Sequence, residues 1–291
     1  MGKTRYAVVV VHGIGAGTGK EREGFSETLR KNVQNELHDG FSLCWKEADW
    51  EGENDNVDRT IRRVIVDVCN GYLSDVGKQA EIVSEPWPGE QSKCGILRIV
   101  LRWVRCLIAI AIRLKKFALE EIKDYAPGIV DAVVDLPLYL DDKHGDKIRE
   151  RVRTAIGEAM SCDGVEGVVL VGHSLGSVIA YDVVIEEQKS GNKKNIVALV
   201  TMGSPLGWVS EIRNVENGAA EQTPQLPVNG IPWRNFWDEA DPVPERKPLD
   251  EEMLPGVKND MVTSGLKLIS AHCAYWKDGG IAKTIAELCQ R

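Results

Sequence analysis

Residues 165–176 read VEGVVLVGHSLG, a pattern that indicates how the chain folds. The apolar run from Val165 to Val171 is typical of a β-strand buried on both faces of a sheet. Apolar residues then recur at helical spacing from Leu175 to Val183, which predicts a helix directly after the strand. Glycines stand two positions either side of Ser174, because side chains there would clash in so tight a turn. Such a turn raises the serine hydroxyl above the sheet edge, next to the N–H groups that begin the helix.

Strand and helix patterns alternate along most of the chain. Further strands are predicted at Tyr6–Val11, Phe41–Trp45, Ile196–Met202 and Trp233–Trp237, and helices over 24–38, 145–160 and 281–288. This alternation indicates an α/β fold, with helices on both faces of a mostly parallel sheet. Residues 51–129 break the pattern. We therefore expect a core made of 1–50 and 130–291, into which 51–129 is inserted as a helical cap or lid.

The composition is that of an ordinary globular protein. The 291 residues are 43% hydrophobic and 27% charged, which excludes a mostly disordered chain and a multi-span membrane protein. The net charge of −8 argues against a nucleic-acid-binding surface, since phosphate needs clustered positive charge. The seven cysteines form no Cys-x-x-Cys pair, and the apolar run Ala7–Val11 is too short for a signal peptide. We therefore expect free thiols and a cytoplasmic location; the sequence leaves the oligomeric state open.

The glycine-rich loop at residues 12–20 suggests nucleotide binding, but its register excludes it. A Walker A loop ending at Gly19-Lys20 needs a glycine where Ile14 stands and a hydroxyl residue where Glu21 stands. The dinucleotide-binding fingerprint Gly-x-Gly-x-x-Gly also fails. Its third glycine is replaced by Thr18 if the motif starts at Gly13, and by Lys20 if it starts at Gly15. No His or Cys pair has zinc spacing. We expect neither a cofactor nor a metal.

Ser174 becomes a nucleophile only if a base takes its proton. Of the five histidines, only His272 follows the serine in the chain, near the C-terminus where such a base is expected. It comes after the apolar stretch Leu266–Ile269, so we expect it at the end of a last strand. His272 is therefore the predicted general base.

The base needs a buried carboxylate, which fixes its tautomer and stabilises the imidazolium. Asp238, Glu239 and Asp241 follow the predicted strand that ends at Trp237. We favour Asp241, because the proline after it holds it in an extended conformation at the start of a loop. Asp238 remains the alternative.

The oxyanion of an acyl-transfer intermediate needs two backbone donors. One is the N–H of Leu175, the residue after the nucleophile. The second is expected in the loop after the first strand, where we favour the N–H of Ile14, with Gly15 as the alternative. His12 is expected to order this loop.

These residues together resemble a known superfamily. His12-Gly13, Gly172-His173-Ser174-Leu175-Gly176, Asp241-Pro242-Val243 and His272 are similar to the lipase and serine-esterase branch of the α/β-hydrolases. Residues 172–182 (GHSLGSVIAYD) and 235–243 look like intracellular phospholipase A1 of the DDHD type and related lipase-like proteins. The resemblance implies an α/β-hydrolase fold, a nucleophile elbow around Ser174 and ester hydrolysis without a cofactor. It would carry catalytic roles onto Ser174, Asp241 and His272.

The leading expectation is a serine carboxylester hydrolase that acts on a lipid or other small-molecule ester through an acyl-enzyme. Two alternatives stay open. The same triad would serve a thioesterase, protein deacylase or amidase, and the same fold would serve a non-catalytic binding module.

Residues 95–116 form a basic amphipathic segment with six Lys or Arg residues and no acid. Most of the positive charges fall on one narrow arc of a helix, and the rest of the circumference is apolar. The longest uncharged run, Cys106–Ile112, is too short to span a bilayer. The segment is expected to be a cap helix, a peripheral contact with anionic lipid or a partner interface.

Overall fold

The computed structural model describes residues 5–13, 19–38, 41–50, 136, 139–140, 142–191, 195–216, 228–266 and 269–291. The chain divides into two units, one made of Met1–Trp50 with Arg149–Arg291 and the other of Glu51–Ile148. The predicted cap, its basic segment at 95–116 and the loop residues Ile14 and Gly15 lie outside the described residues. The described strands all belong to the first unit.

The described residues form a six-stranded sheet in the order β2-β1-β3-β4-β5-β6. Every neighbouring pair of strands is parallel. The strands are β1 (Tyr6–Val11), β2 (Trp45–Ala48), β3 (Gly167–His173), β4 (Ile196–Met202), β5 (Trp233–Trp237) and β6 (Val257–Met261). A parallel sheet requires a crossover between each pair of strands, usually through a helix. The predicted α/β fold with a parallel sheet is confirmed.

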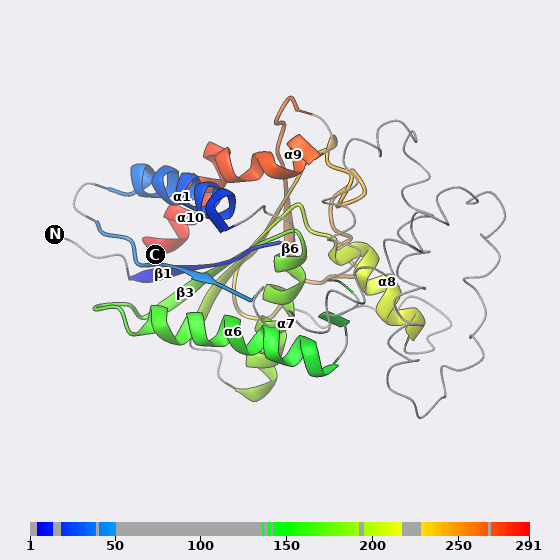
Figure 1. Ribbon diagram of the computed structural model, residues 1–291, viewed down its shortest axis with the longest axis horizontal. Coiled ribbons are helices and arrows are strands. Elements are labelled where there is room, and N and C mark those ends of the chain that lie inside the picture. Colours follow the sequence, from blue (N-terminus) through cyan, green and yellow to red (C-terminus); the bar gives the residue numbers. More distant parts are fainter. Residues whose placement is uncertain are drawn as a thin grey trace. The chain divides into compact units, whose positions relative to one another are not determined.

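Helices cover both faces of the sheet (Figure 1). They are α1 (Gly19–Glu36), α6 (Asp142–Met160), α7 (Leu175–Ser190), α8 (Leu206–Glu216), α9 (Ile269–Ala274), the 3-10 turn η3 (Tyr275–Lys277) and α10 (Gly279–Cys289). α1 and α10 lie on one face, and α7 lies on the other with the part of α6 that follows Arg149. The fold is therefore a three-layer α/β/α arrangement, as the alternating pattern predicted.

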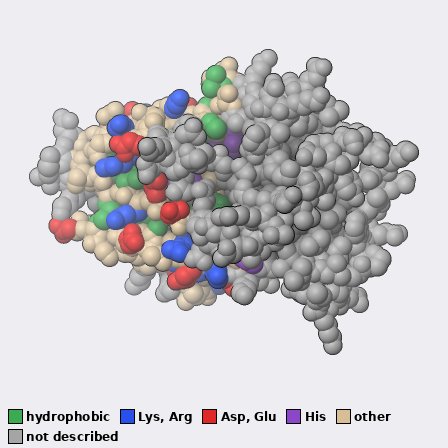
Figure 2. Space-filling model, in the orientation of Figure 1, with side chains coloured by type: hydrophobic (Ala, Val, Ile, Leu, Met, Phe, Trp, Pro, Cys, Tyr) green, Lys and Arg blue, Asp and Glu red, His purple; other side chains and the backbone are tan. Residues whose placement is uncertain are grey.

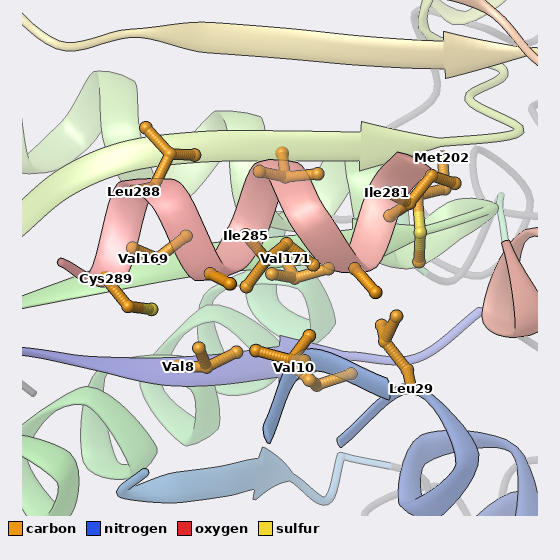
Figure 3. Close-up of a cluster of buried hydrophobic side chains, with 14 of the residues drawn as sticks. Val8, Val10, Leu29, Val169, Val171, Met202, Ile281, Ile285, Leu288 and Cys289 are labelled. Atoms are coloured by element: carbon orange, nitrogen blue, oxygen red, sulfur yellow. The ribbon is translucent and has the colours of Figure 1, made fainter. Parts of the chain in front are cut away.

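The alternation of side chains along β1 and β3 divides the apolar residues between the two faces. Val8 and Val10 from β1, with Val169 and Val171 from β3, belong to the cluster that α1 and α10 cover. Figure 3 shows Ile285 of α10 directed at this group of valines. All of these side chains are fully buried. Burial of each such side chain contributes about 1.5–3 kcal/mol, so this layer fixes the strands that carry the site.

Two strand predictions are corrected. β2 begins at Trp45, where the predicted strand ended, and β6 was not predicted at all. β6 reads Val-Lys-Asn-Asp-Met and lies at the edge of the sheet, so only one of its sides is paired and it lacks a continuous apolar run. Neither described end of the stretch Leu266–Ile269, expected as the last strand, lies in a strand: Leu266 is outside any strand and Ile269 begins α9.

The expectation of free cysteines is wrong for one pair. Cys44 and Cys162 form a disulfide, with their Cα atoms 6.6 Å apart, whereas Cys273 and Cys289 are free. The two bonded residues are 118 positions apart in sequence, and spacing alone carries no signal for such a pair. Disulfides are rare in reducing compartments, so the cysteines no longer support the expected cytoplasmic location.

The described surface mixes charges of both signs. Figure 2 shows Lys and Arg side chains interspersed with Asp and Glu on the described part of one face. No helix within the described ranges is both long enough and apolar enough to cross a bilayer.

Candidate active site

The order of the strands places the predicted nucleophile at the point where the sheet changes direction. After β1 the chain runs to β2 on one side, and then returns to β3 on the other side. In open parallel sheets, ligands bind at the carboxyl ends of the two strands that flank such a point. Gly13 follows β1 and Ser174 follows β3. A Cβ added to Gly13 would lie 2.4 Å from Ser174 Cβ and 3.1 Å from its Oγ, so the backbone of Gly13 lies directly against the serine side chain.

Ser174 has an unusual backbone conformation. It lies between β3 and α7 with φ 55° and ψ −130°, a region that non-glycine residues rarely adopt. A Cβ on Gly172 would lie 2.6 Å from the Gly176 carbonyl oxygen, and one on Gly176 would lie 2.1 Å from the Val11 carbonyl oxygen. The two glycines thus allow the close approach that keeps Ser174 strained. Strain of this kind costs of order 1–3 kcal/mol and is concentrated at functional sites.

The backbone around Ser174 is anchored on three sides. Its N–H donates to the Met202 carbonyl of β4 at 3.0 Å, and its own carbonyl accepts from the Ser177 N–H at 2.9 Å. The Ser177 hydroxyl contacts the same carbonyl and lies 2.7 Å from the Ser204 hydroxyl. Leu175, the predicted oxyanion donor, is the first residue of α7. The first N–H groups of a helix have no partner within the helix, so this end of α7 can offer a donor to an anion.

Asp241 and His272 are in direct contact. The His272 Nδ1–H donates to Asp241 Oδ2 at 2.8 Å, and the carboxylate is fully buried. The other carboxylate oxygen, Oδ1, accepts from the Val243 N–H at 2.9 Å. In a neutral imidazole, a proton held on Nδ1 leaves Nε2 as the acceptor, which is the atom that a general base uses.

Asp238, the alternative acid, holds the loop instead. Its Oδ1 accepts from the Ala240 N–H at 2.8 Å, and its Oδ2 accepts from the Ser264 N–H at 2.9 Å. Burial favours the neutral acid, but the hydrogen bonds from Ser264 and Ala240 outweigh it, and the pKa of Asp238 is lowered. Of the two aspartates, Asp241 is the one that contacts His272.

His272 lies beside the turn that carries Ser174. It lies in α9, and His173, the last residue of β3, donates from Nε2 to the His272 carbonyl at 2.8 Å. The two imidazole rings are 4.5 Å apart, measured between centroids. Burial and the neighbouring His272 hold the pKa of His173 well below its usual value. His173 therefore stays neutral and keeps the backbone of His272 next to the residue that precedes the serine.

Sequence reasoning missed two residues that contact the Asp241–His272 pair. Gly203 follows β4 with φ 53°, and a Cβ there would lie 2.9 Å from both Asp241 Oδ2 and His272 Nδ1. The Tyr275 hydroxyl donates to Asp241 Oδ2 at 2.8 Å. Two signals in the sequence could have identified them: Gly203 follows the end of a predicted strand, and Tyr275 lies one helical turn after His272.

His12 lies in the wall of the site. Its side chain is almost fully buried, and Nε2 donates to Glu47 Oε2 at 3.1 Å. Its ring stacks on Trp276, with 5.3 Å between centroids, and its carbonyl accepts from Trp50 Nε1 at 3.2 Å. These contacts fix the end of β1, where the glycine-rich loop begins. Within the described ranges, no three His, Cys, Asp or Glu side chains are grouped so that they could hold a metal.

No protein-family model matches the chain. A search of curated proteins finds a probable mitochondrial phospholipase of Saccharomyces cerevisiae, 28% identical over 104 residues. The match covers 33% of this chain and only 14% of the yeast protein.

Solved structures give weaker likenesses. The RedJ thioesterase from the prodiginine pathway of Streptomyces coelicolor is 17% identical, with 49% of this chain and 68% of that chain covered and a TM-score of 0.33. The NocB thioesterase domain is 16% identical, with 48% and 72% covered and a TM-score of 0.29. The α/β fold rests on the parallel sheet itself rather than on these likenesses.

Proposed function

We propose that this protein is a serine hydrolase that cleaves carboxylic esters through Ser174, His272 and Asp241. The observation that carries the proposal is the buried Asp241–His272 hydrogen bond of 2.8 Å, held beside the strained turn at Ser174. A buried carboxylate on Nδ1 fixes the tautomer of the imidazole and stabilises the imidazolium that forms during reaction. Such a turn holds the serine hydroxyl at the carboxyl edge of the sheet, where it can attack an acyl carbonyl.

The reaction follows from these roles. Ser174 Oγ bonds to the acyl carbon while His272 Nε2 takes the hydroxyl proton, and the carbonyl oxygen becomes an oxyanion. The N–H of Leu175 stabilises that oxyanion, with a second N–H from the loop at Ile14. The intermediate expels the alcohol, which receives the proton from His272. Water, deprotonated by the same imidazole, then attacks the acyl-enzyme and releases the acid and free Ser174.

We infer that the substrate is a lipid ester. Two observations support this class: the similarity of 104 aligned residues to a yeast protein named as a probable phospholipase, and the resemblance of the motifs around Ser174 and Asp241 to lipases. A lipid substrate also suits residues 95–116, which we propose bind an anionic membrane surface. Binding to phosphatidylserine vesicles that weakens with added salt would support this contact. Absence of binding at low salt would overturn it.

The test compares wild type with Ser174→Ala on a panel of acyl esters, matching thioesters and phospholipids. We expect wild type to hydrolyse oxygen esters and Ser174→Ala to lose nearly all turnover. Ser190→Ala, at the exposed far end of α7, is the matched control and should behave as wild type. Hydrolysis by Ser174→Ala at the wild-type rate would contradict the proposal. Preference for the thioesters would keep the triad but replace the substrate class.

A further inference from the structure

Tyr275 shares the carboxylate oxygen that His272 uses. Its hydroxyl donates to Asp241 Oδ2 at 2.8 Å, and the His272 Nδ1–H donates to the same oxygen at 2.8 Å. Tyr275 begins η3, three residues after His272, so both donors come from one continuous helical segment. The side chain is fully buried. The mechanism above makes no use of this phenol.

The other described titratable groups around the Asp241–His272 pair add no positive charge, so the Tyr275 hydroxyl acts on the Asp241 carboxylate through its dipole. The described titratable groups that face the pair are His173 from β3, Cys273 from α9 and Asp238 from the loop after β5. His173 stays neutral, burial raises the pKa of the Cys273 thiol, and Asp238 is an anion. The exposed Lys277 acts on Cys273. None of the three facing groups brings a positive charge to Asp241.

The phenol remains a hydrogen-bond donor throughout the working pH range. Burial, and then the negative charge of Asp241, raise the pKa of Tyr275 well above its usual value. A neutral O–H that points at Oδ2 withdraws negative charge from that oxygen. Less charge at Oδ2 means less stabilisation of the imidazolium on His272.

We infer that Tyr275 is a positioning residue that fixes the carboxylate of Asp241 and weakens its hold on the His272 proton, so that Ser174 is activated at lower pH. The inference rests on the proposed function and deepens it. It predicts that removing the phenol hydroxyl moves the acidic limb of the activity profile to higher pH, because the imidazolium then persists to higher pH.

A purely structural role for Tyr275 predicts something different. The ring belongs to the buried cluster between the sheet and α10, and Tyr275→Phe keeps that ring. A side chain that only packs or adds stability affects the melting temperature when it is changed, and the titration of His272 stays where it is. The pH profile therefore separates the two roles.

The first experiment measures the rate at which a fluorophosphonate probe labels Ser174 as a function of pH. We expect the acidic limb of Tyr275→Phe to move up by roughly 0.5–1 pH unit, part of the free energy of one hydrogen bond to a charged group. Tyr181→Phe is the matched control, because Tyr181 is buried in α7 and packs on Trp233. Its limb should match that of wild type. In an Asp241→Asn background, Tyr275→Phe should produce no further shift.

The second experiment is an NMR titration of the histidine ring signals in Ser174→Ala, with and without Tyr275→Phe. His272 is assigned by its loss in His272→Gln, and this readout needs no reactive serine. If wild type fails to label, the proposed function is overturned, and the His272 midpoint alone then decides the role of Tyr275.

Two outcomes decide the inference on Tyr275. Superimposable midpoints with and without Tyr275→Phe would overturn it and leave the residue structural. If Tyr275→Phe melts too early to measure, 3-fluorotyrosine at position 275 keeps the packing. As a stronger donor it should move the midpoint to lower pH, and an unchanged midpoint would also overturn the inference.

Discussion

The serine side and the acid–base side of the candidate site are built in different ways. Ser174 lies in one short stretch, where a buried strand, two glycines and a helix follow each other along the chain. Asp241 and His272 are 31 positions apart, and loops, an edge strand and α9 bring them together. The first side is dictated by local sterics. The second depends on tertiary contacts between single side chains. Variants on the acid–base side should therefore lose activity, and variants at the glycines of the serine turn should lose stability.

The largest expected effect comes from the acid–base side. Asp241→Asn keeps the size of the side chain but presents an amide to His272, which destabilises the imidazolium. We expect kcat on an oxygen ester to fall by about 10³–10⁴-fold. Asp238→Asn is the matched variant and should keep kcat close to the wild-type value, because Asp238 accepts from Ala240 and Ser264 instead. Equal losses in the two variants would show that the carboxylates have been assigned wrongly.

The next effect tests the serine side through stability. In Gly176→Ala the added methyl group would lie 2.1 Å from a backbone oxygen of β1. Neither β1 nor α7 can move away to relieve this clash. We expect a loss of about 3 kcal/mol in the free energy of unfolding, measured by urea titration. The control is Gly157→Ala in α6, where a Cβ meets nothing within 4 Å. It should gain about 1 kcal/mol of helix stability. A Gly176→Ala variant as stable as this control would mean that the turn is not tight.

The smallest effect concerns the pH dependence of the loop after β5. The pKa of Asp238 is lowered in the folded protein, so its ionised form adds stability above the unfolded value and that stability is lost as pH falls through the folded value. Asp238→Asn should flatten the acid side of the curve of unfolding free energy against pH, by about 1 kcal/mol. Parallel curves for wild type and variant would show that the loop does not depend on this carboxylate.

The elements that could be predicted from the sequence are those set by a local residue pattern. The bounds of β1, β4 and β5 were predicted without error. β1 and β4 are apolar runs typical of buried strands, and β5 is a short aromatic stretch that ends before Asp241-Pro242. β6 could not be found, since an edge strand with a lysine and an aspartate resembles a loop. His272 was chosen by elimination among the histidines. It was expected at the end of a strand, but it lies in the helix α9. The Cys44–Cys162 bond joins residues 118 positions apart, and no local rule indicates it. The contact of Tyr275 with Asp241 could be suspected from its spacing of one helical turn from His272, but the partner across 34 positions could not.

Covalent labelling shows whether His272 and Asp241 activate Ser174. Wild type, His272→Gln and Asp241→Asn are treated with a fluorophosphonate at neutral pH, and the modified residue and its rate are read by peptide mass spectrometry. We predict a single adduct on Ser174 in wild type, with the rate falling steeply in both variants. An unlabelled wild type, or a Ser174 that reacts equally fast without His272, would show that these residues do not form a catalytic triad.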